Sequence, residues 1–185
     1  MRIDYSIEFF SYWHCGSGLA AGADVDELAI KDGDGLPYVP GRTVKGLLRD
    51  AAESLARAGA VDGAFIPEVF GVSGDEEGHG QRSLASFSDA TLSEREREVI
   101  TEGKLQDGLF ASVSSTAIGD DGIAKDHTLR KLQVAVPCTV TGSITGVPES
   151  AEKDLVTCMS MVKRMGLGRS RGLGRCEIRA ERKGD

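Results

Sequence analysis

Hydrophobic and polar residues alternate over several stretches of the chain, which is typical of strands with one buried face. In the segment Arg2–Trp13 one face is apolar and consists of Ile3, Tyr5, Ile7 and Phe9. Similar alternation predicts further strands at residues 83–92, 134–144 and 173–180. The elements of a β-sheet are therefore distributed from one end of the chain to the other.

A helical period separates these strands. We predict Thr43 to be an N-cap, because apolar residues then recur every three or four positions as far as about Arg57. Gly59 is expected to end this helix. Pro148 and Glu149 are expected to open a second helix at about residues 150–163.

The resulting order of strand, helix, strands, strand, helix and strand predicts an α+β fold, namely a ferredoxin-like or RRM-like arrangement. We expect residues 1–185 to form a single domain, with insertions at about residues 14–41, 71–82, 93–108 and 119–132. The charged segment 93–108 is predicted to be a surface helix or a mobile insertion. Residues 109–146 predict two strands about a protruding hairpin, with its tip near residues 120–127.

Composition and cysteine spacing limit the classes of protein to consider. The 185 residues are 40% hydrophobic and 28% charged, which is typical of a globular protein. No apolar run approaches the ~18 residues that a membrane span needs, so we expect a cytoplasmic protein with no membrane partner. The spacing of the four cysteines argues against a zinc knuckle or a redox dithiol and favours buried free thiols. They are Cys15, Cys138, Cys158 and Cys176.

The net charge of −7 at first disfavours a nucleic-acid partner. Its distribution is uneven, because residues 163–183 contain eight basic and two acidic residues. This segment therefore carries +6, which leaves −13 for the rest of the chain. A basic stripe on an acidic body can bind a polyanion while the acidic remainder faces other proteins.

The stretch "LPYVPGRTVKGLLRD", residues 36–50, opens a basic helix after a proline turn. A helix N-terminus presents free N–H groups and a partial positive charge, and four polar side chains follow on its first turns. They are Arg42, Thr43, Lys45 and Arg49. Gly46 costs about 1 kcal/mol inside a helix, so close approach of a phosphate or sugar, or tight packing on the sheet, is expected there. The alternatives are a phosphate cradle and a solvated basic face.

A second basic stretch, "GLGRSRGLGR", runs from the predicted second helix into the last strand. It lacks the Gly-Lys-Ser/Thr of a P-loop, and a dinucleotide fingerprint would run from strand to helix instead. Glycines let a backbone approach a ligand closely, and arginines bind phosphates in a fork. The candidate phosphate-binding residues are Gly166, Gly168, Arg169, Ser170, Arg171 and Gly172. The alternatives are a polyphosphate site, a small nucleotide-binding enzyme and a disordered basic linker.

Together these motifs resemble the RAMP superfamily of CRISPR-associated proteins. The glycine-rich loop before the last strand resembles its signature, and "LPYVPGRTVKGLLRDAAE" resembles its helix start. "SLASFSDATL" is similar to its recurring strand, and "STAIGDDGIAKDHTLRKLQVAVPCTVTGSI" to its thumb hairpin and core strand. The resemblance covers most of the chain in the expected order.

The resemblance implies a backbone subunit of a type III effector complex, which binds CRISPR RNA beside copies of itself and other subunits. Its thumb would enter between guide and target RNA and flip a base. The thumb residues implied are Ile118, Asp126, His127 and Leu129.

Many such subunits also cut target RNA with a loop aspartate and a divalent metal, Mg²⁺ or Mn²⁺. The layout of "DELAIKDGDGLPYVPG" places Asp26 at that position. A carboxylate could act as a general base towards the ribose 2′-OH, or hold the metal. His14 is a further acid–base candidate. The competing acidic residues of the same loop are Asp24, Glu27, Asp32 and Asp34. A structural subunit that cuts nothing is the alternative.

Overall fold

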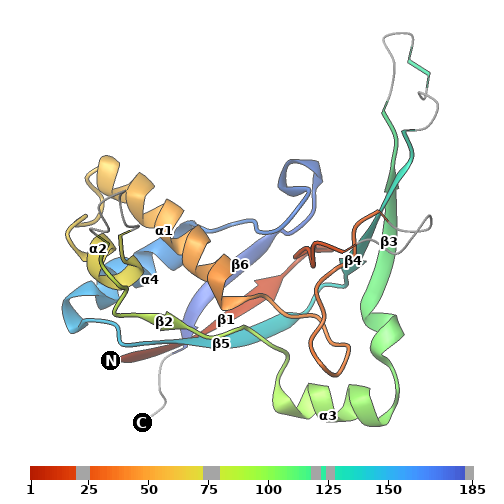
Figure 1. The fold of residues 1–185 in the computed structure, drawn as a ribbon, viewed down its shortest axis with the longest axis horizontal. Helices are drawn as coiled ribbons and strands as arrows, with labels where there is room; N and C mark the ends of the chain where they lie inside the picture. Colours follow the sequence, from red (N-terminus) through yellow and green to blue (C-terminus); the bar gives the residue numbers. More distant parts are fainter. Residues whose placement is uncertain (20–25, 73–79, 118–121, 124–127, 182–185) are drawn as a thin grey trace.

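Four antiparallel strands form the main sheet of the computed structural model, which describes residues 1–19, 26–72, 80–117, 122–123 and 128–181. The spatial order is β2-β5-β1-β6 (Figure 1). The bounds of these strands are Arg2–Phe9 for β1, Ser86–Phe87 for β2, Thr139–Thr145 for β5 and Cys176–Glu181 for β6.

The two long helices α1 (Gly41–Arg57) and α4 (Glu152–Met161) pack on one face of this sheet, beside the short α2 (Phe65–Phe70). Helix α1 connects β1 to β2, and α4 connects β5 to β6. This is the split β-α-β arrangement, so the predicted α+β, ferredoxin-like fold is confirmed. None of the helices among the described residues is long and apolar enough to cross a membrane.

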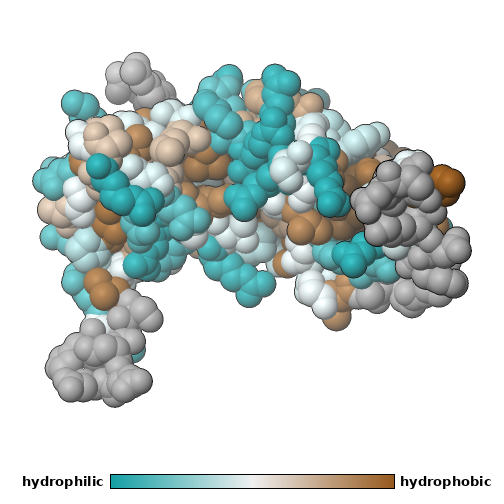
Figure 2. Space-filling model, turned by 90° about the horizontal axis from the view of Figure 1, so that it is seen from above, coloured by the Kyte–Doolittle hydropathy of each residue, from teal (hydrophilic) through white to brown (hydrophobic). Residues whose placement is uncertain are grey.

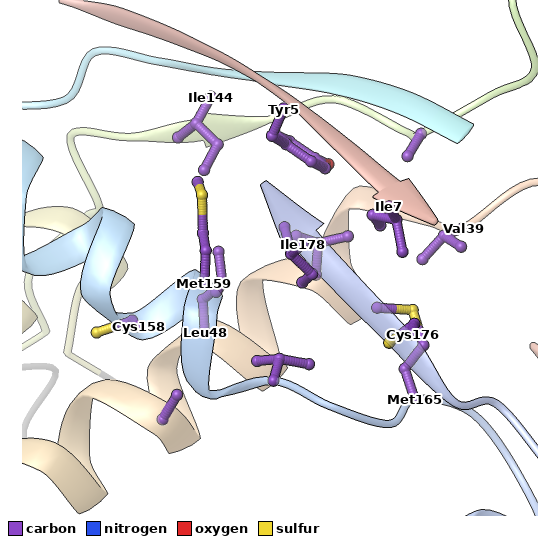
Figure 3. Packing of buried hydrophobic residues seen from close by; sticks show 14 of the residues in the cluster. Tyr5, Ile7, Val39, Leu48, Ile144, Cys158, Met159, Met165, Cys176 and Ile178 are labelled. Atoms are coloured by element: carbon purple, nitrogen blue, oxygen red, sulfur yellow. The ribbon is translucent and has the colours of Figure 1, made fainter. Parts of the chain in front are cut away.

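The core lies between the sheet and these helices. The predicted apolar face of β1 is buried, and Figure 3 shows Tyr5 and Ile7 with Ile144 and Ile178, facing Met159 and Leu48 on the helices. Burying each such side chain stabilises the fold by about 1.5–3 kcal/mol. The free thiols of Cys15, Cys158 and Cys176 are buried as well. Burial raises the pKa of Cys15 to about 12, so this thiol stays protonated at neutral pH.

A second, two-stranded sheet projects from the body (Figure 1) and consists of β3 (Phe110–Ser115) and β4 (Arg130–Ala135). It is the predicted hairpin. Its base is attached to the body by Trp13, which pairs with Ala135 and donates its indole N–H to the carbonyl of Val136 over 3.0 Å. The predicted thumb residues Ile118, Asp126 and His127 lie outside the described residues, and Leu129 is exposed.

The charged segment 93–108 contains a helix, α3 (Glu94–Glu102), and a short 3₁₀ turn, Gln106–Leu109. The helical alternative is therefore correct. Ser93 and Glu96 form a capping box at the start of α3. Arg97 then binds Asp32 and Asp34 of the long loop after β1, which attaches the helix to the body.

Several predicted boundaries were wrong. Helix α1 begins at Gly41 with Pro40 as its N-cap, so Thr43 is not the cap. The single strand predicted at 134–144 is two strands in different sheets, because residues 136–138, with a proline at 137, leave the ladder. Strand β2 is only two residues of the predicted 83–92, although Thr91 and Thr141 exchange backbone hydrogen bonds further along. The first strand ends at Phe9, the last begins at Cys176, and α4 covers 152–161 of the predicted 150–163.

Candidate nucleic-acid interface

Three segments that are far apart in the sequence meet in one pocket of about 550 Å³, which lies where β3 and β4 lead into the tip of the hairpin. The first is the loop with Asp26 and Glu27, the second is the hairpin, and the third is the glycine loop. We call this the hairpin-base pocket, after the base of the hairpin tip. Its lining residues are Asp26, Glu27, Val113, Ser114, Ser115, Arg130, Lys131, Leu132, Leu167, Gly168, Ser170, Arg171 and Leu173.

Asp26 is held against β4 by two hydrogen bonds with the backbone of Lys131. The Asp26 N–H donates to the Lys131 carbonyl over 2.9 Å, and the Asp26 carboxylate accepts the Lys131 N–H over 2.7 Å. Glu27 continues this pairing, because its carbonyl accepts the N–H of Gln133 over 3.0 Å. The second carboxylate oxygen of Asp26 accepts no hydrogen bond from the described residues, so it is available to a ligand.

The structure separates the acidic residues that competed in the sequence. Asp32 and Asp34 are paired with Arg97 and do not line the hairpin-base pocket. Burial alone would raise the pKa of Asp32, but hydrogen bonds from Arg97 and from the backbone of Leu36 and Asp34 outweigh it and hold that pKa below its usual value. Asp26 and Glu27 both line the pocket, and residue 24 lies outside the described residues.

His14 lies behind the pocket and is 1% exposed. Its Nδ1 is 2.7 Å from the carbonyl of Gln133, which only accepts, so Nδ1 carries the proton. Its Nε2 is buried without a hydrogen-bond partner among the described residues and lies 3.8 Å from the Glu27 carboxylate. The His14 carbonyl accepts the N–H of Leu167 over 3.0 Å. A side chain this buried cannot touch RNA, so His14 positions the segments around it.

The glycine loop has a defined turn. Residues Arg169–Arg171 form a 3₁₀ turn between Gly168 and Gly172, which both have the left-handed conformation that favours glycine. Gly166 also has a positive φ of 83°, and a Cβ there would collide with the His14 carbonyl. Arg169, Ser170 and Arg171 are exposed, and Arg164 donates to the Arg169 carbonyl over 2.6 Å. The turn therefore presents two arginines to solvent.

The sequence analysis missed the basic residues of the hairpin base. Arg130 and Lys131 line the hairpin-base pocket, and Arg130 and Arg171 together line an adjoining pocket of about 520 Å³. The cations of the hairpin-base pocket thus outnumber its two carboxylates. The dipeptide Arg-Lys directly after the hairpin tip was the available signal. Figure 2, which looks down on the molecule as drawn in Figure 1, shows hydrophilic side chains interspersed with hydrophobic patches on that side.

The start of α1 does not line this pocket. Its first N–H group, that of Gly41, donates to the Asp89 carboxylate over 2.7 Å, so an internal anion binds the helix N-terminus. Arg42 is exposed, Lys45 is half-buried, and Arg49 pairs with Glu53 over 2.9 Å. These residues and Thr43 remain predicted RNA ligands on a separate surface.

Gly46 lies on the same side of α1. It is exposed, and a Cβ there would meet nothing within 4 Å. Packing on the sheet therefore does not explain this glycine.

A divalent metal fits the hairpin-base pocket only in part. The described residues contain no group of three histidine, cysteine, aspartate or glutamate side chains that could hold a metal. Asp26 and Glu27 supply two neighbouring carboxylates, and the remaining ligands of a bound cation would be water and substrate phosphate.

Comparison with known families gives the identity of this fold. The model of the RAMP superfamily matches residues 6–177. The chain belongs to the RAMP superfamily. The matched range begins within β1 and ends in β6, so it includes the glycine loop. A comparison with curated protein sequences gave no match.

Solved structures agree with the RAMP fold. One similar chain comes from the cryo-EM structure of the type III-B Cmr-beta bound to cognate target RNA, with a TM-score of 0.74, 11% identity and 97% of each chain covered. Another comes from the apo state of the type III-B Cmr-beta, with a TM-score of 0.70, 13% identity and the same coverage. At these identities the likeness concerns the fold.

Proposed function

We propose that this RAMP chain is an RNA-binding backbone subunit of a type III CRISPR effector complex, and that it cuts target RNA at the hairpin-base pocket. The observation that carries the proposal is the meeting of Asp26, the hairpin base and the glycine loop in one pocket. The solved relative bound to target RNA supports the same assignment. CRISPR RNA, target RNA, other subunits and copies of the chain are the partners.

The pocket suits an RNA backbone. Arg130, Lys131 and Arg171 supply positive charge from two directions, and arginines bind phosphates in a bidentate fork. Strands β3 and β4 project from the body (Figure 1), so the hairpin is placed to enter between two paired strands. A base displaced in this way leaves its ribose 2′-OH and phosphate accessible to the residues at the hairpin base.

In the proposed cleavage the ribose 2′-oxygen attacks the adjacent phosphorus. A bond forms between them, the bond from phosphorus to the 5′-oxygen breaks, and the products are a 2′,3′-cyclic phosphate and a 5′-hydroxyl end. The Asp26 carboxylate accepts the proton of the 2′-OH, and water returns a proton to the leaving 5′-oxygen. Arg130 and Arg171 stabilise the charge that develops on the phosphate.

A divalent cation, Mg²⁺ or Mn²⁺, would add electrostatic stabilisation of the phosphate when bound. Glu27 is the residue that would hold it, because the free carboxylate oxygen of Asp26 serves as the base in this scheme; holding the metal is the alternative role of that oxygen. A structural subunit that binds RNA without cutting is the second candidate. It is favoured by the hydrogen bond through which the Asp26 carboxylate already fixes the loop to β4.

The deciding experiment compares three variants of the chain, purified with its bound RNA and supplied with complementary RNA and Mg²⁺ or Mn²⁺. Asp26→Asn should lower the cleavage rate by about 100-fold or more, because a catalytic base is lost, while RNA binding stays unchanged. Asp107→Asn, an exposed residue that does not line the pocket, is the matched control and should cleave normally. Glu27→Gln tests the other carboxylate.

Cleavage by wild type that persists in Asp26→Asn would assign the chemistry to another residue. Bound RNA with no cleavage by wild type would establish the structural subunit instead. Equal loss of RNA binding and cleavage in Asp26→Asn would show that this residue only shapes the pocket.

A further inference from the structure

A further pocket, lined by residues at the two ends of the glycine loop, combines an aromatic ring with three cationic side chains. It has a volume of about 340 Å³. We call it the Phe10 pocket. Its lining residues are Phe10, Lys163, Arg164, Arg175, Cys176 and Glu177.

The ring of Phe10 is exposed for a structural reason. The ring of Phe9 points into the core and stacks on Trp13, with the ring centroids 4.3 Å apart. Because successive side chains of an extended chain point to opposite sides, Phe10 points away from the core. Phe10 is 44% exposed, and the Arg175 guanidinium lies over its ring at 5.6 Å from the centroid. An exposed aromatic ring with a cation over one face is a platform on which a nucleobase can stack.

The cations of this pocket are held close together by backbone pairing. Arg164 and Arg175 lie opposite each other in an antiparallel bridge, which Met165 and Gly174 extend by a 2.9 Å hydrogen bond. A Cβ at Gly174 would collide with the Met165 carbonyl, so glycine allows this close approach. Like charges opposite each other destabilise a pair of strands, and Lys163 adds a third. A bound anion would relieve this repulsion.

The single carboxylate in the pocket offsets little of this charge. Glu177 forms an ion pair with Arg179 over 2.6 Å, and Arg179 does not line the Phe10 pocket. The Phe10 pocket is therefore locally cationic in a chain whose net charge is −7.

We propose that the Phe10 pocket binds one nucleotide of single-stranded RNA, with the base stacked on Phe10 and the phosphate on Lys163 and Arg175. The proposal rests on the proposed function, because the RNA is the strand that the glycine loop also binds. Arg164 connects the two places: it lines the Phe10 pocket and donates to the Arg169 carbonyl at the tip of the loop.

The test measures binding of a fluorescent oligouridylate, tens of nucleotides long, to the full chain and to the chain in its purified assembly. Phe10→Leu keeps an apolar side chain but removes the ring, and should weaken binding roughly 10-fold, as expected for one lost stacking contact. Arg175→Gln should weaken it as well. Tyr12→Leu is the matched control, because Tyr12 is equally exposed at 44%, two residues away, and does not line the pocket. RNA carrying 4-thiouridine should crosslink to the peptide that contains Phe10.

Each other outcome overturns the proposal in a distinguishable way. If Phe10→Leu and Arg175→Gln bind like wild type while Arg171→Gln binds weakly, RNA uses the glycine loop but not this pocket. If wild type binds no RNA, alone or in its assembly, the proposed function fails too. If Phe10→Leu releases a protein from the assembly and leaves RNA binding unchanged, the occupant is an acidic protein segment. Circular dichroism and thermal unfolding, measured for every variant, are the controls that test whether each variant folds.

Discussion

At the scale of single residues, two glycines of α1 lie in opposite environments, so replacing each by alanine should have opposite effects on stability. Gly41 packs so closely on β2 that a Cβ would collide with the Phe87 carbonyl, whereas Gly46 is exposed with open space around its Cα. The first glycine is explained by the fold. Gly46 lowers the stability of the helix, and no packing contact requires a glycine there. Of the two explanations considered, packing on the sheet and close approach of an RNA backbone, only the second remains.

We therefore expect Gly46→Ala to raise the free energy of unfolding by about 1 kcal/mol, because alanine is the better helix former. The same change should weaken RNA binding, since the new methyl group occupies the space that the RNA backbone approaches. Chemical denaturation and fluorescence anisotropy measure the two effects. Gly41→Ala is the contrasting variant and should destabilise the fold. A stabilised Gly46→Ala variant with normal RNA affinity would remove this surface from the interface.

The residue-level site was only partly predictable from the sequence. The layout of the loop selected Asp26 by resemblance and gave Glu27 only as a competing residue, whereas the structure places both of them in the hairpin-base pocket. Among the described acidic residues of this loop, only Asp26 and Glu27 line the pocket. The reason is the pairing of Asp26 with Lys131, which comes 105 residues later in the chain. A contact of this kind leaves no local pattern. The role of His14 depends in the same way on Gln133 and Glu27.

At the scale of elements, local signals were only partly reliable, because the predicted N-cap Thr43 was wrong whereas the helical alternative for residues 93–108 was correct. Ser93 and Glu96 have the spacing of a capping box, and α3 begins there. The partner of α3 was not predictable, because Arg97 binds Asp32 and Asp34, which precede it by more than 60 residues. The attachment of α3 thus depends on ion pairs that bridge two insertions of the fold.

This attachment should weaken in acid. The folded-state pKa of Asp32 lies below its unfolded value, so its stabilising effect is present at neutral pH. The effect decreases from about pH 5 downward and is lost as the pH falls through the folded pKa. The protection factors of the α3 amides, which correct the hydrogen-exchange rates for the intrinsic rate at each pH, should therefore fall in acid. Arg97→Gln should show fast exchange already at pH 7, and Arg95→Gln, exposed on the same helix, should behave as wild type. Equal exchange in wild type and Arg97→Gln would show that other contacts hold α3.

At the scale of the whole molecule, charge is separated between surfaces. The outward side chains of β1 and β6, on the sheet face opposite the helices, include Asp4, Glu8, Glu177 and Glu181, against two arginines. An RRM-like sheet that binds RNA would carry aromatic residues there. The cations gather instead at the hairpin base and glycine loop. The net charge of the chain therefore conceals a local excess of cations, which the sum of charges over residues 163–183 already indicated.

This separation predicts which charges contribute to the salt dependence of RNA binding. Each phosphate contact releases a counterion, so Arg171→Gln or Arg130→Gln should reduce the slope of log K against log salt concentration by about 0.7–1. Arg179→Gln is the matched control, because Arg179 is an exposed arginine on the acidic sheet face and should leave the slope unchanged. Fluorescence anisotropy with single-stranded RNA over a series of salt concentrations measures these slopes. If Arg179→Gln reduced the slope as much as Arg171→Gln, RNA would be attracted by the overall field of the protein, and the hairpin-base pocket would lose its assignment as the RNA site.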